Sequence, residues 1–126
     1  MSPSTVSTAF VRSALRSLDA GQQLELLAEA GIATERAAQA GARVPAAAFG
    51  RLWLLVARRL DDEFFGLDSR RMKVGSFAMI CHALAGQSSV GDALRLALRG
   101  FGLYFDDIAA SLHVVGGGQA VIRLSN

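Results

Sequence analysis

The sequence has little of what cross-links a chain or carries it into a membrane. Cys81 is the only cysteine among 126 residues, so no disulfide can form within the chain. The longest purely apolar run, Leu52 to Ala57, is far shorter than the ~18 residues of a membrane span. The first residues, Met1 to Thr8, lack the basic start and apolar core of a secretion signal. We therefore expect a cytoplasmic protein that does not enter a membrane.

Concentrated positive charge is also missing. The formal net charge is +2, and Lys73 is the single lysine. The arginines are scattered from Arg12 to Arg123, whereas nucleic-acid binders gather basic side chains on one element. We therefore do not expect these residues to bind DNA or RNA directly.

Apolar residues are what the sequence has in excess. They make up 52% of the chain, against 19% for charged residues. Apolar content this high excludes a disordered chain, and the length fits one domain over residues 1–126. The surplus apolar surface must be covered by a subunit interface, by further chain or by a ligand.

Most of the chain carries apolar residues at helical spacing. The pattern predicts helices over residues 6–18, 22–30, 34–40, 45–60, 76–86 and 89–104. Phe10, Ala14, Leu15 and Leu18 form the first apolar stripe. In the fourth segment Leu54 and Leu55 widen the apolar surface until it nearly encircles the helix, which predicts a central, buried element. Ala-Gly at 20–21, 30–31 and 40–41 is interpreted as C-terminal helix caps.

After Tyr104 the spacing changes to the alternation of a strand. The alternating apolar positions are Ile108, Ala110, Leu112 and Val114, then Ala120, Ile122 and Leu124, with Gly116–Gly118 between them. This predicts a C-terminal β-hairpin, so the fold class is α+β, mainly helical, with about five to six helices before the hairpin. Because an isolated hairpin is marginal in water, we expect it to begin a larger sheet, completed by chain beyond Asn126 or by another subunit.

Few side chains are suited to catalysis. Cys81 and His82 are adjacent, so on a helix they point about 100° apart and do not face each other. With His113 they are too few and too widely spaced for a metal site. The acidic group Asp61, Asp62, Glu63 and Asp68 lacks the alternation of a calcium loop and is interpreted as a solvated turn. The sequence therefore predicts no enzyme, no metal and no cofactor.

One group of residues is suited to binding a ligand. Phe77, Met79, Cys81 and His82 come from the fifth helix, Tyr104 from the end of the sixth, and His113 from the hairpin. Helices packed on a sheet leave clefts where apolar side chains with a few polar tips gather. The group is either ordinary core or an effector pocket, lined by Phe77, Cys81, His82, Tyr104 and His113. Arg95 and Arg99 either pair with an anionic effector, such as a carboxylate, or are simply exposed to solvent.

Residues 44–107 resemble a known family. The similarity runs through Val44-Pro45, Phe49 to Leu60, Asp61-Asp62, Phe65-Gly66-Leu67, Gly75-Ser76-Phe77, Cys81-His82-Ala83-Leu84 and Ser88 to Leu94. Gly66-Leu67 after an acidic turn and the helix start Ser89-Val90-Gly91-Asp92-Ala93-Leu94 are its most specific parts. The pattern resembles the N-terminal sensor domain of AraC-type transcription regulators, of the arabinose-binding type.

The resemblance implies an intracellular bacterial regulator of transcription. Its sensor domain would bind a small-molecule effector, form a homodimer, or both. DNA would be bound only by a pair of helix-turn-helix units, which we expect beyond Asn126, so that the chain is a fragment. The alternative is a dimerisation module that binds no ligand.

Overall fold

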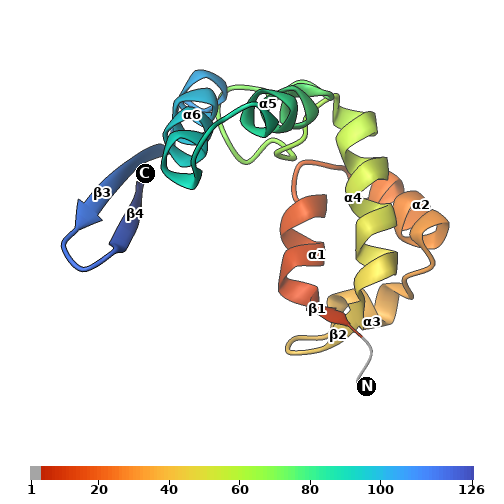
Figure 1. The fold of residues 1–126 in the computed structure, drawn as a ribbon. Coiled ribbons are helices and arrows are strands. Elements are labelled where there is room, and N and C mark those ends of the chain that lie inside the picture. Colours follow the sequence, from red (N-terminus) through yellow and green to blue (C-terminus); the bar gives the residue numbers. More distant parts are fainter. Residues whose placement is uncertain (1–3) are drawn as a thin grey trace. The chain divides into compact units, whose positions relative to one another are not determined.

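The computed structural model describes residues 4–126, which form six helices and four strands in the order β1–α1–α2–α3–β2–α4–α5–α6–β3–β4 (Figure 1). These residues divide into two compact units, the first ending at Phe65 and the second comprising Gly66–Asn126. The fold is α+β, mainly helical, with a C-terminal hairpin, as the sequence predicted. No helix within residues 4–126 is both long enough and apolar enough to cross a membrane.

The first unit combines four helices with a short strand pair. Its elements are β1 (Thr5–Ser7), α1 (Thr8–Leu15), α2 (Ala20–Ala30), α3 (Thr34–Ala38), β2 (Arg43–Pro45) and α4 (Ala46–Leu60). β1 pairs antiparallel with β2, and Val6 lies opposite Val44. The predicted helical start at Val6 is wrong, because residues 5–7 are extended and the Ser7 hydroxyl caps α1 by accepting the Ala9 N–H at 3.2 Å.

The core of this unit lies where α4 passes between α1 and α2 (Figure 1). Val11, Leu26, Leu52 and Val56 are at most 2% exposed. Burying one such side chain contributes roughly 1.5–3 kcal/mol. Phe10, which the sequence placed in the first stripe, is 63% exposed. Val11 occupies the core instead, since it shares a helical face with the buried Ala14, Leu15 and Leu18.

α4 is the central helix of this core, as the sequence predicted, but part of its wide apolar surface is exposed. Its buried residues are Ala48, Leu52, Val56 and Ala57. Leu54, on another face, is 57% exposed. Trp53 is half-exposed and packs edge-on against Phe49 and Phe65, with ring centroids 5.9 and 4.7 Å away. α1 and α2 both pack against α4, and Leu54 lies on the part of its surface that they leave uncovered.

The helix ends of this unit show which Ala-Gly pairs are caps. Gly31 ends α2 with a left-handed φ of 75°, as predicted. Gly21 instead lies in the first turn of α2, where Asp19 and Gln22 form a reciprocal capping box. Gly41 follows α3 in a turn, and the cap residue of α3 is Gln39. The cap interpretation is therefore confirmed at Gly31 and wrong at the other two pairs.

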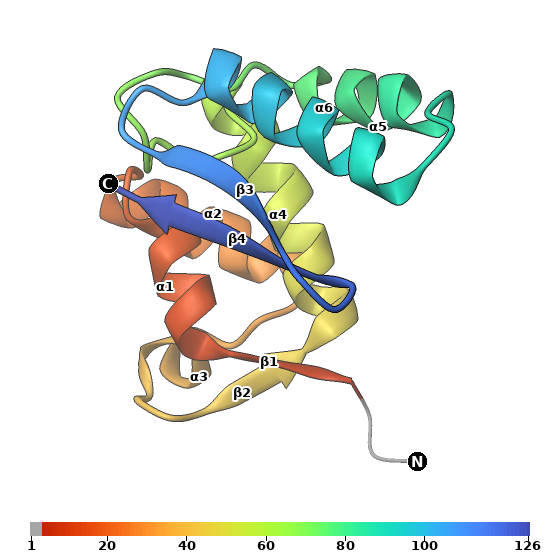
Figure 2. The same ribbon diagram turned by 60° about the vertical axis from the view of Figure 1, so that its left-hand side comes forward.

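The second unit consists of α5 (Ser76–Ala85), α6 (Val90–Tyr104), β3 (Ala109–Val115) and β4 (Gln119–Ser125) (Figure 2). α5 and α6 pack side by side where Gly100 allows close approach: a Cβ there would lie 3.4 Å from the Ile80 side chain. Ser89 caps α6 by accepting the Asp92 N–H at 3.1 Å. A local signal thus fixes the start of α6.

The loop before α5 is fastened to the chain after α6 by two aspartates. The Asp68 carboxylate accepts the backbone N–H groups of Arg70, Asp106 and Asp107, each at 2.9 Å. Asp107 in turn accepts the N–H and the hydroxyl of Ser69 at 2.7 and 2.9 Å. Burial acts to raise the pKa of Asp68, but the three N–H groups and the nearby Arg70 charge hold that pKa below its ordinary value.

The interpretation of the acidic group as a solvated turn is wrong for two of its members. Asp62 is 4% exposed and Asp68 is 7% exposed. The Asp62 carboxylate accepts the Phe64 N–H at 2.9 Å. Backbone N–H groups brought together by folding replace water around these carboxylates, and the sequence alone does not reveal them.

The hairpin has one apolar face and one mixed face. Its register pairs Ala110 with Leu124, Leu112 with Ile122 and Val114 with Ala120, as the predicted alternation requires. Gly117 and Gly118 adopt left-handed φ angles of 82° and 75° in the predicted turn. Among the described residues of this unit, the buried apolar side chains are Met72 and Ile80. The apolar face of the hairpin is therefore left largely uncovered, with Val114 72% and Leu124 68% exposed.

Candidate functional site

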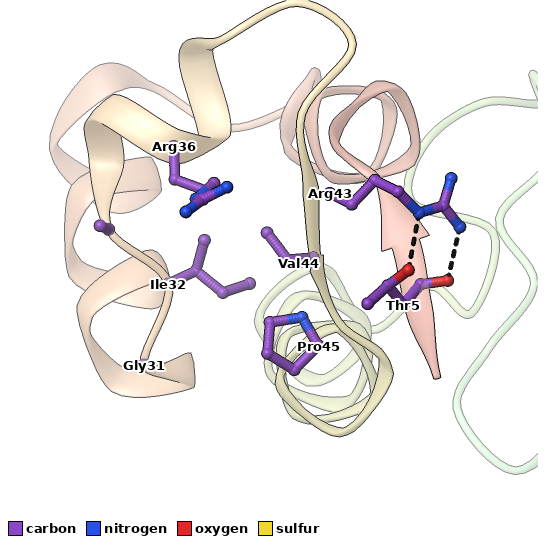
Figure 3. Close-up of a pocket in the computed structure, with 8 residues that line it drawn as sticks. Thr5, Gly31, Ile32, Arg36, Arg43, Val44 and Pro45 are labelled. Atoms are coloured by element: carbon purple, nitrogen blue, oxygen red, sulfur yellow. Dashed lines mark hydrogen bonds between the residues drawn. The ribbon is translucent and has the colours of Figure 1, made fainter. Parts of the chain in front are cut away.

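An open hollow of about 400 Å³ lies in the first unit (Figure 3). It is formed by the end of α2, the connection to α3, the start of α3 and the strand pair. The residues that line it are Thr5, Gly31, Ile32, Ala33, Arg36, Arg43, Val44 and Pro45. Its size is at the lower end of the range for small-molecule sites, roughly 300–1,000 Å³.

The floor of the hollow is set by how α2 ends. Gly31 turns the chain left-handed, and the Ile32 N–H then donates to the Leu27 carbonyl at 2.9 Å. The Arg51 guanidinium binds the Ala30 carbonyl at 2.9 and 3.2 Å, which holds this end against α4. Ile32 is consequently 4% exposed and lies beneath the opening. Val44 of β2 is 2% exposed and supplies the adjoining side of the floor.

Two arginines line the hollow, and they have different roles. Arg43 points to the far side of β2, where its Nε donates to Thr5 Oγ1 at 2.6 Å and its Nη2 to the Thr5 carbonyl at 2.8 Å (Figure 3). Arg36 points into the hollow, over Ile32 and Val44 (Figure 3). Within residues 4–126, no carboxylate pairs with the Arg36 guanidinium and no carbonyl accepts from it. Arg43 therefore stabilises the strand pair, whereas Arg36 is available to a ligand.

The chemistry of the lining suits binding. The eight lining residues include no carboxylate, imidazole or thiol, so these side chains supply no general base and no thiolate nucleophile. What they offer is one available positive charge above an apolar floor. Such an arrangement recognises an anion attached to an apolar body.

A family model described as the arabinose-binding domain of AraC transcription regulators, N-terminal, matches residues 21–126. The chain belongs to this family. It is a ligand-sensing regulatory domain of the AraC type, and its role lies in transcription regulation. No curated protein and no solved structure matches the chain. The matched segment contains seven of the eight residues that line the hollow, all except Thr5.

A second, smaller hollow of the AraC-type domain lies at the end of the hairpin. Its volume is about 190 Å³, and Ile108, Leu124, Ser125 and Asn126 line it. It offers no charged side chain, so the larger hollow of the first unit is the stronger candidate for binding an effector.

The residues that the sequence suggested for a pocket lie in the second unit. On α5, Phe77 is 54% exposed, and Cys81 and His82 are also exposed. Phe77 and Cys81 are four residues apart and share a face of the helix. Tyr104, at the end of α6, is half-buried. None of these four residues lines either hollow, and their role in binding remains a prediction.

The remaining predicted residues are also at the surface. His113, on the mixed face of the hairpin, is exposed, and its Nε2 lies 3.0 Å from the Ser111 hydroxyl. Arg95 forms an exposed ion pair with Asp92 at 3.3 Å, and Arg99 is exposed on α6. Within residues 4–126, no group of His, Cys, Asp and Glu side chains is placed to hold a metal ion.

Sequence reasoning missed the hollow in the first unit because its walls are far apart in the chain. Thr5 and Arg43, which are 38 residues apart, come together only through the pairing of β1 with β2. Strands of three residues carry too short a pattern to be recognised. Gly31 was identified as a cap, and that is the one local signal that pointed to this place.

Proposed function

We propose that this AraC-type domain binds a small-molecule effector in the hollow of the first unit and thereby controls the DNA-binding part of a regulator. The observation that carries the proposal is the Arg36 guanidinium, which has no partner among the described residues and stands over a buried apolar floor within the segment matched by the family. The proposal places the protein in the bacterial cytoplasm, with DNA contacted through the regulator's helix-turn-helix units.

The physical basis is differential binding. A ligand shifts a regulator between two arrangements only to the extent that it binds one of them more tightly. The hollow is bounded by α3 on one side and by the strand pair on the other. An effector in the hollow would therefore contact both, and it would favour the arrangement in which α3 and β2 lie at the distance that the effector spans.

The first test is a thermal-shift screen of the 126-residue chain against classes of metabolites: sugars including arabinose, carboxylates, amines and neutral apolar compounds. A ligand at one hundred times its Kd stabilises the fold by about 2.7 kcal/mol. We expect at least one class to raise Tm in a saturable way. If every class leaves Tm unchanged, effector binding by this domain is wrong.

We further propose that the domain has no catalytic activity. Mass spectrometry of the bound ligand, after prolonged incubation with the chain, provides the measurement. We expect the ligand to be recovered unchanged. Conversion to a product in proportion to protein concentration would make the chain an enzyme.

A homodimer is the second part of the proposal, and the hairpin favours it. Val114, Ile122 and Leu124 form an apolar face that is 46–72% exposed. Exposed apolar faces of this kind mark association sites. If the chain were only a dimerisation module, this face would be its functional surface and the hollow would bind nothing.

The neighbours Ile122 and Val121 provide a matched pair for testing the dimer. Their exposed fractions are 46% and 49%, but they lie on opposite faces of β4. We expect the chain to sediment as a dimer, Ile122→Asp to sediment as a monomer and Val121→Asp to remain a dimer. A wild-type chain that remains a monomer at high concentration would exclude association through this face.

A further inference from the structure

We infer that the effector of this domain is a small carboxylate with an apolar body, held by Arg36, and that a sugar is a poor fit. The inference rests on the proposed function, since it names the class of ligand for the same hollow. The family's description names arabinose, a sugar, as the ligand. We infer a carboxylate here because the residues that line the hollow have few of the polar groups that a sugar requires.

Two cations line the hollow, and only one of them is available to a ligand. A guanidinium binds a carboxylate through two parallel, charge-assisted hydrogen bonds. Arg36 is the one arginine of the lining that points into the hollow, because Arg43 is already bonded to Thr5 on the far side of β2 (Figure 3). One guanidinium matches the single charge of a carboxylate. A phosphate dianion would leave charge unpaired at this site.

Apolar side chains lie beneath the Arg36 guanidinium. The side chains of Ile32 and Val44 are almost fully buried, and Pro45 adjoins them. An alkyl or aryl group placed there is removed from water without breaking a hydrogen bond, which contributes about 25 cal/mol per Å² of apolar surface. The ligand's anionic end and its apolar body are thus matched by adjacent parts of the hollow.

The same lining disfavours a sugar. Each hydroxyl group taken out of water needs a hydrogen-bond partner in the site, or binding is weakened. The only hydroxyl of the described lining belongs to Thr5, and it already accepts from Arg43 at 2.6 Å. The other uncharged side chains of the lining are hydrocarbon or absent, so several hydroxyl groups of a pentose would lack side-chain partners.

The experiment uses the isotope-labelled 126-residue chain and follows its backbone amide signals during titration. The probes are hexanoate, benzoate and phenylacetate, their uncharged amides, and arabinose. We expect each carboxylate that binds to shift the signals of Ile32, Ala33, Arg36 and Val44 in a saturable way. The corresponding amide should bind about tenfold more weakly, because it keeps the apolar body but loses the charge-assisted pair.

Four variants assign the interaction to Arg36. Arg36→Gln should weaken binding of the carboxylate by about tenfold, down to the level of the amide, whereas Arg36→Lys keeps the charge and should recover part of that loss. Arg58→Gln, at an exposed arginine of α4 outside the lining, should leave the affinity unchanged. Ala33→Phe, which adds a ring at the lining, should weaken binding of carboxylates and amides alike. Unchanged amide spectra away from the hollow confirm that each variant is folded.

The outcomes separate this inference from the proposed function. If no carboxylate gives saturable shifts at these residues, or if the amides bind equally well, the inference is wrong. If arabinose or a neutral compound binds instead, the domain still senses an effector and only the class named here fails. If carboxylate binding is insensitive to Arg36→Gln, the assignment to this hollow fails.

Discussion

Leu52 and Leu54 lie two residues apart on α4 and have opposite environments. Leu52 is fully buried between α1 and α2, whereas Leu54 is 57% exposed. Truncating a buried leucine to alanine removes its apolar burial and leaves a cavity, at a cost of about 2–5 kcal/mol. Leu52→Ala should therefore remove a large part of the stability of the first unit, because a small domain is held by roughly 5–15 kcal/mol in total.

The control is Leu54→Ala, which makes the same chemical change on the same helix. Little of its side chain is removed from water on folding, and alanine has the higher helix propensity, so we expect a change within about 0.5–1 kcal/mol. The two substitutions differ only in burial. Their comparison therefore tests the direction in which α4 faces, which the sequence left undetermined.

Trp53 makes the assay specific to the first unit. It is the only tryptophan of the chain, and it packs against Phe49 and Phe65 within that unit. In urea unfolding followed by its fluorescence, Leu52→Ala should lower the midpoint by about 1–2.5 M, given a slope near 2 kcal/mol per molar. Equal midpoints for the two variants, or a larger loss for Leu54→Ala, would refute the placement of α4.

Three further predictions concern other parts of the chain. Folding lowers the pKa of Asp68, so its ionised form stabilises the second unit at pH values above the ordinary carboxyl pKa. This contribution is lost as the pH falls through the lowered pKa. Asp68→Asn should therefore make acid unfolding, followed by circular dichroism, less dependent on pH. Gly31→Ala should cost about 1–2 kcal/mol in urea unfolding because φ is +75°, whereas Gly50→Ala, within α4 and with open space around it, should stabilise by up to about 1 kcal/mol. Phe77→Ala should leave the affinity for hexanoate unchanged, and a loss of binding would return the site to α5.

The second unit could be predicted closely because its signals are local. The serine cap at Ser89 and the alternation on both sides of Gly116–Gly118 lie within a few residues of the structures they specify. The helix start at Ser76 was also predicted, although the cap residue is Gly75 and no side chain caps this helix. Such signals depend on neighbours in the chain, which a sequence displays directly.

The first unit was harder to predict because its organisation depends on long-range contacts. The strand pair that joins residues 5–7 to 43–45 places the start of α1 at Thr8, later than the predicted Val6. The burial of Asp68 likewise depends on N–H groups 38 and 39 residues away. The candidate site also depends on long-range contacts. Arg36 stands out as the ligand-binding arginine only because Arg43 is hydrogen-bonded to Thr5. No spacing rule distinguishes these two arginines in the sequence.

The two units differ in how many of their apolar side chains are buried. The first unit holds an apolar core, and two of its members, Ile32 and Val44, form the floor of the hollow. α6 has no buried residue, and every residue of β4 is exposed. Elements with few buried contacts open most easily and respond most to a partner that covers them. Under the proposed function, the effector site and the surface that association would cover therefore lie in different units of the chain.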